Sequence, residues 1–263
     1  MAEIISNKYY NEQSVFLPEN LLREARRQKN KKECKVPAIC LLDPDGDLAD
    51  YLLRKKLAVK NHCWACYHSS LYTFPLDDFE IGIIPCVVGA SYAVLVAEQL
   101  FVSGCKLLIS VTSAGIINQH SSDKRFALIT SSIRDEGTSY HYLPAGELCA
   151  LNKEIKDLLA SSHEKDECPF FGAKSWTTDA PYRETPTAIE NMKKLNVACV
   201  EMEASALYAL AHVKGYKIIC FAHLTNSMAQ EDGDFEKGNE FGSIDTLNLI
   251  RYVLNILSTE KVN

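Results

Sequence analysis

The chain has 263 residues, 47% of them hydrophobic, and a formal net charge of −6. This length suits one large α/β domain or two small ones, and the apolar content is ample for a sizeable core. The acidic balance argues against nucleic acid as a partner, because a phosphate backbone is bound by basic surface. No apolar run approaches the roughly 20 residues that cross a bilayer. Residues 1–13 lack the apolar middle of a signal peptide, so we expect a cytoplasmic protein that does not bind membranes.

In chain order, a basic, helix-like segment over residues 14–33 comes first, and short apolar runs then alternate with helical patterns. The runs predict strands over residues 37–43, 81–88, 106–111, 126–132, 170–174, 197–200 and 217–223. The helical patterns predict helices over residues 47–56, 91–102, 147–161, 187–195, 204–213 and 243–257.

Alternation of strands and helices implies parallel pairing with right-handed crossovers. No linker rich in glycine, proline and serine divides the chain. We therefore expect one three-layer α/β/α domain over residues 36–263, with a mixed, largely parallel central sheet. Residues 1–35 would form an N-terminal helical extension.

The ten cysteines are scattered, and most lie in apolar runs where a free thiol packs as a small hydrophobe. The exception is the segment 62–68 (HCWACYH), which contains His62, Cys63, Cys66 and His68. A lone Cys-x-x-Cys can indicate redox chemistry or half of a zinc site. No second cysteine pair follows at zinc-ribbon spacing, and the aromatic residues nearby favour a strand continuing through residues 71–74. We interpret the motif as structural and expect ten reduced cysteines.

In open sheets of this type, ligands bind beyond the carboxyl ends of the strands. Small or polar residues follow the predicted strands at residues 43–47, 89–91, 112–115, 176–179, 201–203 and 225–226. Gly89 precedes a predicted helix, whose first amides can bind an anion, although an ordinary turn is the alternative. These segments together predict a pocket with hydroxyls and acids but few cations.

Glu201 and Glu203 stand where a predicted strand becomes a helix, between apolar flanks. If the junction is extended, both carboxylates point to the same side. Burying two charges is costly unless they have partners. A solvated surface pair is the alternative, but the apolar flanks favour a clamp for a polyol.

These motifs, in this order, resemble the nucleoside phosphorylase family, in the branch of uridine phosphorylases, hexameric purine nucleoside phosphorylases and methylthioadenosine nucleosidases. The resemblance runs from about residue 36 to about residue 257 and is most specific at residues 200–204 (VEMEA). It implies that Met202 packs on ribose and that Glu203 accepts hydrogen bonds from the sugar hydroxyls. It also implies a homo-oligomer, from a dimer to a hexamer, with sites completed across subunits.

The resemblance extends to the groups around the base. The segment Ser113-Ala114-Gly115 is similar to the family's loop beneath base and ribose, so Ala114 and Gly115 are expected at the base. Ser113 and Gly89 are expected to hold phosphate or water. Residues 131–142 resemble a segment of uridine phosphorylases.

Tyr182 and Arg183 fall in the place of the family's base-contacting loop. An aromatic ring can stack on a base, and a guanidinium can pair with its carbonyl. The alternative is a surface ion pair between Arg183 and Glu184.

Asn226 falls where the purine enzymes carry an aspartate that protonates the base. An asparagine has no titrating proton to give, but it can donate a hydrogen bond to a carbonyl oxygen. We therefore expect Asn226 and Glu201 to be catalytic and the base to be a pyrimidine type. Asp232 or Asp234 could instead supply the acid.

The family's phosphate-binding arginines are missing. Residues 43–47 carry Asp43, Asp45 and Asp47 without an arginine, and Ser110 stands where another arginine is usual. These acids would repel phosphate unless cations came from His68, Lys106 or the basic segment of a neighbouring subunit. Their spacing matches no recognised metal loop, so we expect no metal site.

Three functions fit these residues. We predict a nucleoside phosphorylase that uses a nucleoside and phosphate as substrates and needs no cofactor, with Glu201 and Glu203 stabilising the charge of an oxocarbenium-like transition state. A nucleosidase is the first alternative, with Asp45 or Glu201 orienting a water. A nucleoside-binding protein without chemistry is the second.

Overall fold

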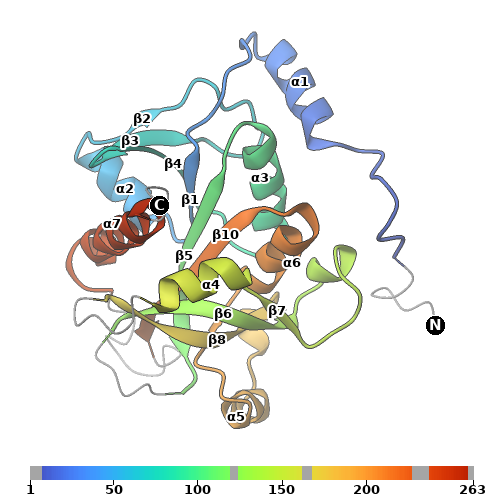
Figure 1. Cartoon of the computed structure of the whole chain (residues 1–263), viewed down its shortest axis with the longest axis vertical. Coiled ribbons are helices and arrows are strands. Elements are labelled where there is room, and N and C mark those ends of the chain that lie inside the picture. The colour runs from blue at the N-terminus through green and yellow to red at the C-terminus, as the bar shows by residue number, and fades with distance from the viewer. Residues whose placement is uncertain (1–7, 119–123, 162–167, 227–236, 260–263) are drawn as a thin grey trace.

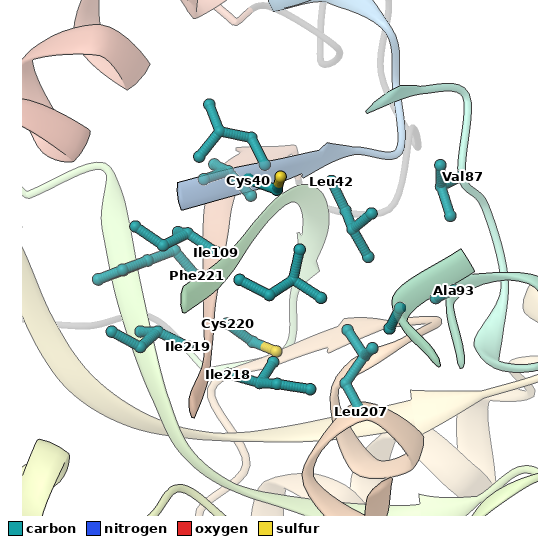
Figure 2. Packing of buried hydrophobic residues seen from close by; sticks show 14 of the residues in the cluster. Cys40, Leu42, Val87, Ala93, Ile109, Leu207, Ile218, Ile219, Cys220 and Phe221 are labelled. Carbon is teal, nitrogen blue, oxygen red and sulfur yellow. The ribbon is translucent and has the colours of Figure 1, made fainter. Parts of the chain in front are cut away.

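The computed structural model describes residues 8–118, 124–161, 168–226 and 237–259. Three apolar runs form parallel strands at its centre: β1 (Ile39–Asp43), β5 (Leu107–Ile116) and β10 (Lys217–Asn226). Successive side chains of a strand point to opposite faces. Ile218 and Cys220 accordingly point toward Leu207, while Ile219 and Phe221 point to the other face (Figure 2). Both faces are buried, which explains why these strands are continuously apolar.

The sheet continues on both sides of the centre. Beyond β1 lie β4 (Phe79–Pro85), β3 (Tyr72–Leu76) and β2 (Val59–Lys60), and beyond β10 lie β6 (Phe126–Asp135), β8 (Phe170–Thr178) and β9 (Cys199–Glu201). The short β7 (Leu148–Ala150) pairs with β6. The longest pairings are parallel, and the predicted mixed, largely parallel sheet is confirmed.

The end of β5 closes one half of the sheet into a ring. Its first residues, Leu107 to Ser110, pair with β1, whereas Gly115 and Ile116 pair with β9. Since β10 pairs with both β5 and β6, the strands β5, β10, β6, β8 and β9 form a closed circuit. The strand ends that carry the predicted site residues therefore converge.

Helices cover both sides of the sheet (Figure 1). On one side α3 (Ala90–Val102) packs against α6 (Ala204–Lys214), and α1 (Pro18–Gln28) packs against α3. On the other side α7 (Ser243–Thr259) contacts α2 (Asp47–Arg54) and α4 (Lys153–Ala160). The remaining helix, α5 (Pro186–Lys194), precedes β9. The predicted helical layers on both faces of the sheet are confirmed.

Two predicted elements are wrong. The helix predicted over residues 147–161 is divided into β7 and α4, because the Asn152 side chain caps α4 by accepting hydrogen bonds from the amides of Glu154 and Ile155. The strand predicted through residues 62–74 begins only at Tyr72, and residues 61–71 form an irregular loop.

The cysteines also differ from expectation at one place. Cys34 and Cys63 form a disulfide across 29 residues, so the prediction of ten free thiols is wrong for this pair. The other eight are free, and all except Cys86 are buried. Among the described helices, none combines the length and apolar character that a bilayer span requires.

Candidate functional site

The candidate site lies at the carboxyl ends of β1, β5, β9 and β10. In the parallel register, His223 lies opposite Ser113 and Asn226 lies opposite Gly115. The backbone of Asn226 therefore ends β10 beside the predicted base loop, while its side chain is outside the described part of the structure, as are Asp232 and Asp234.

Glu201 is buried and bound by protein groups at both carboxylate oxygens. Oε2 accepts hydrogen bonds from the amides of Glu203 and Ala204, each at 2.7 Å, which holds the elbow between β9 and α6. Oε1 accepts from three hydroxyls, those of Ser132, Ser175 and Thr177. Burial raises the pKa of Glu201, and these hydrogen bonds oppose that increase. The arrangement makes Glu201 a positioning residue for the elbow and offers its predicted catalytic role no support.

Glu203 is placed differently, although it stands only two residues away. Its Oε1 accepts a hydrogen bond from the Gly89 amide at 2.7 Å. Its Oε2 is buried and makes no hydrogen bond of standard geometry among the described residues, although the Thr112 hydroxyl lies near enough to the carboxylate to favour its charged form. Burial, followed by the neighbouring Glu201, raises the pKa of Glu203 to about 8. A buried polar atom without a partner costs free energy. This oxygen is therefore suited to bind a ligand hydroxyl, and the clamp inferred from the sequence stays a prediction.

Asp45 occupies the predicted anion site at Ser113. Its Oδ2 accepts a hydrogen bond from the Ser113 amide at 2.9 Å, and its Oδ1 accepts from the Ser113 hydroxyl at 2.8 Å. The two predicted anion donors, Ser113 and Gly89, are thus both engaged by carboxylates of the chain itself.

A buried lysine compensates these acids. Lys237 Nζ lies 2.6 Å from Asp47 Oδ2 and 3.2 Å from Asp45 Oδ2, and only 9% of its side chain is exposed. The cations that the sequence suggested as partners for this loop did not include Lys237, because it lies 190 residues from Asp47.

Asp43 stands apart from the other two acids. It is 7% exposed, and its Oδ2 accepts a hydrogen bond from the Ala49 amide at the start of α2. Burial raises the pKa of Asp43 to about 7, and the charges of Asp45 and Asp47 add to the increase. A carboxyl group with this pKa exchanges its proton near neutral pH.

These groups surround a cavity of about 20 Å³, which Asp43, Asp45, Asp47, Ser113, His223 and Lys237 help to line. That volume holds about one water molecule. The His223 ring stacks on Phe126, its Nε2 has no partner among the described residues, and burial lowers its pKa to about 4. His223 is therefore a neutral polar group in contact with this cavity.

The residues predicted to contact the base and ribose lie on separate elements. Ala114 is buried and Gly115 half-buried on β5, and Met202 is half-buried at the elbow. Tyr182 and Arg183 belong to the 3-10 turn η2 (Pro181–Arg183), where both are exposed and Tyr182 is 99% exposed. Tyr182 therefore packs against no other element in the part of the chain that the structure describes.

Residues 131–142 make hydrogen bonds that connect β6 to the turn after it and to α6. The buried Arg134 guanidinium donates to the Ser139 hydroxyl and to the carbonyls of Leu143 and Pro144. Glu136 accepts from the hydroxyl of Ser205 near the start of α6 and from the amide of Ser139. This network ties β6 to the elbow rather than presenting a free cation to a ligand.

The hydroxyls of Ser132 and Ser175 were not predicted as part of the site, whereas Thr177 lies in the predicted segment 176–179. A signal was present, because Ser175 and Thr177 alternate with larger residues in β8 and so share one face of the sheet. His223 and Lys237 gave no comparable signal.

Comparison with known proteins identifies the class. The family model of the phosphorylase superfamily matches residues 38–258, and the chain belongs to that family. A curated relative, a guanosine phosphorylase of Halorubrum lacusprofundi, is 22% identical over 168 residues, which are 64% of this chain and 66% of that protein. The alignment thus covers slightly less than two thirds of the relative.

Solved structures agree on the fold. A uridine phosphorylase from Vibrio fischeri has a TM-score of 0.69 at 15% identity, covering 90% of this chain and 99% of its own. A 5′-methylthioadenosine/S-adenosyl homocysteine nucleosidase from Campylobacter jejuni has a TM-score of 0.66 at 14% identity, covering 83% of this chain and 99% of its own. Enzymes with the two reactions considered above therefore share this architecture.

Proposed function

We propose that the protein cleaves the N-glycosidic bond of a nucleoside and that water, rather than phosphate, attacks the sugar. One observation carries the choice of nucleophile: the chain's own carboxylates already occupy the predicted anion donors at Ser113 and Gly89. A phosphate dianion would have to displace Asp45 from Ser113 and would be repelled by Asp45 and Asp47.

In this proposal Asp43 is the general base. It lines the water-sized cavity, and its pKa of about 7 matches the range in which a general base works best near neutral pH. As the water oxygen bonds to the anomeric carbon, its proton passes to Asp43 and the glycosidic electrons leave with the base. Neutral His223 and the Ser113–Asp45 pair would orient the water.

The sugar would be held by Glu203 and Met202. At neutral pH a Glu203 carboxyl with a pKa of about 8 is mostly protonated, so it keeps its carbonyl oxygen for the Gly89 amide and offers a hydroxyl to the sugar. Glu201 would act indirectly, by fixing the elbow that carries both residues.

Phosphorolysis is the second candidate. It is supported by Lys237, a buried cation beside the same acids, and by the relatives named as phosphorylases. For the base, the pyrimidine preference inferred from Asn226 stays a prediction, since the similar proteins are named for guanosine as well as uridine. The homo-oligomer and the cytoplasmic location likewise stay predictions.

The test is an incubation of the protein with uridine, cytidine, inosine, guanosine and methylthioadenosine, with and without phosphate, followed by chromatography of the free bases. Release of a base at the same rate in both conditions supports hydrolysis. Release only with phosphate supports the second candidate. Tight nucleoside binding without release contradicts both and leaves a binding protein.

A further inference from the structure

Three side chains of types that ligate metals lie together outside the candidate nucleoside site. The Sγ atoms of Cys34 and Cys63 and a ring nitrogen of His62 all lie within 4.8 Å of one another. Cys34 belongs to the segment after α1, whereas His62 and Cys63 belong to the loop between β2 and β3. We propose that this cluster, when its disulfide is reduced, binds one soft divalent cation such as Zn²⁺ through two thiolates and the His62 imidazole.

The distances suit such a cation. With Zn–S near 2.3 Å and Zn–N near 2.0 Å, neighbouring ligand atoms in a tetrahedral site lie roughly 3.5–3.8 Å apart. Cys63 Sγ already lies 3.6 Å from His62 Nε2. The Cα atoms of Cys34 and Cys63 are 5.2 Å apart, so the backbone keeps both sulfurs within reach of one ion after reduction.

The chemistry has two balanced steps. A dithiol reductant gives two electrons and two protons to the Cys34–Cys63 bond, which becomes two thiols, while the reductant becomes a disulfide. The cation then replaces the two thiol protons, which pass to solvent. Two thiolates neutralise the charge of Zn²⁺, and three protein ligands leave one position for water. The exposed side of His62 gives the ion a route from solvent.

Hydrogen bonds hold this loop in addition to the disulfide. Lys31 Nζ donates to the carbonyls of His62 and Trp64, both at 2.9 Å. The Asn61 side chain accepts hydrogen bonds from the amides of Cys63 and Trp64. These contacts hold the backbone of His62 and Cys63 and join it to Lys31, three residues before Cys34, so the reduced ligands stay close together.

Lys29 extends this attachment to the carbonyls of Ala65 and Cys66. An apolar contact of Leu22 and Ala25 in α1 with Ala65 also joins the helix to the loop. The bound cation and the disulfide are therefore alternative cross-links. Either one would connect residue 34, and with it α1, to the loop between β2 and β3.

The test uses the full chain, reduced with a phosphine that is then removed, and titrated with Co²⁺ under anaerobic conditions. Co²⁺ is chosen because thiolate ligands give it a charge-transfer absorption. We expect one Co²⁺ per chain with thiolate absorption, displaced by Zn²⁺, and no such absorption in the oxidised protein. Cys34→Ser and Cys63→Ser should lose the absorption. Cys86→Ser, which changes an exposed cysteine elsewhere, should keep it.

His62→Ala provides a variant on an exposed side chain, for which circular dichroism should show an unchanged fold. It should bind Co²⁺ at least about tenfold more weakly, because one of three ligands is missing. In addition, Zn²⁺ should slow proteolysis within α1 of the reduced wild type. The proposal is overturned if the reduced wild type shows no thiolate absorption, or if Cys34→Ser and Cys63→Ser retain it.

Discussion

The carboxylate of Asp45 accepts hydrogen bonds from both the amide and the hydroxyl of Ser113, at 2.9 and 2.8 Å. Ser113 is thereby satisfied without any bound anion. The same is true of the Gly89 amide, which donates to Glu203. Acids of the chain itself therefore already occupy both predicted anion donors. The cavity beside Ser113 has room for about one water molecule.

Asp45→Ala should create a phosphate site. The change frees two donors on Ser113 and removes a negative charge, while Lys237 stays beside Asp47. Because hydrogen bonds to charged groups contribute about 1.5–3 kcal/mol, phosphate affinity should rise by about tenfold or more. Isothermal titration with inorganic phosphate measures this. Asp50→Ala, at an exposed position on α2, is the control, and equal phosphate affinity in the two variants would count against the assignment.

Asp43→Asn should remove the general base. The turnover rate should fall by about 10²–10⁴, as is usual when a positioned base is lost. In the wild type, kcat/KM should rise with pH through about 7, because Asp43 loses its proton there, and the variant should lack this rise. Initial rates between pH 5 and pH 9 measure both. A wild-type rate that is flat through pH 7 contradicts this role for Asp43.

Glu203→Gln should change how stability depends on pH. Burial raises the pKa of Glu203 to about 8, so the native state holds a proton that the unfolded chain releases near pH 4.5. The contribution of Glu203 to the free energy of unfolding of the wild type should therefore be complete below pH 4.5. It should be lost progressively as the pH rises from there through 8. The glutamine variant should lose less stability between pH 5 and pH 9, by a difference on the order of 2–4 kcal/mol.

Urea unfolding at pH 5, 7 and 9 measures that difference. Glu80→Gln, which changes an exposed glutamate on β4, should keep the wild-type pH dependence. Parallel curves for the wild type and Glu203→Gln would show that Glu203 is not buried as a neutral acid.

Glu201→Ala should destabilise the fold rather than act on chemistry alone. The change leaves two elbow amides and the hydroxyls of Ser132, Ser175 and Thr177 without their shared acceptor. The free energy of unfolding should fall by about 3–5 kcal/mol, since each buried unpaired group costs about 1–3 kcal/mol and some find other partners. Glu190→Ala, at an exposed position on α5, is the control in urea unfolding. A loss below about 1 kcal/mol would contradict the positioning role.

The order of strands and helices could be predicted because the apolar runs are short and bounded by polar or glycine residues. The ring of strands could not, because it depends on β5 being long enough to pair with β1 at Leu107 and with β9 at Gly115. The helix predicted over residues 147–161 was wrong at its start, because the apolar pattern runs on across residue 152. In the structure Asn152 caps α4, so the helix begins only after that residue.

For the candidate site, the sequence indicated the region of the fold but not the individual contacts. Residues that follow parallel strands meet at one edge, which places Gly89, after β4, and Ser113, on β5, near the end of β1. Glu203 follows β9, which is antiparallel to β5, and it reaches this region through the closed circuit of strands. The sequence could not indicate which carboxylate would meet which donor, because those pairs are long-range: Asp45 lies 68 residues from Ser113 and Lys237 lies 190 residues from Asp47. The Cys34–Cys63 pairing was missed for the same reason.

The central claim is tested most directly by the sugar product formed when the protein cleaves its preferred nucleoside in excess inorganic phosphate. Mass spectrometry and phosphorus NMR distinguish the two products. Free pentose as the main product is the expected result, because Asp45 and Glu203 hold the anion donors. Pentose 1-phosphate as the main product would contradict it.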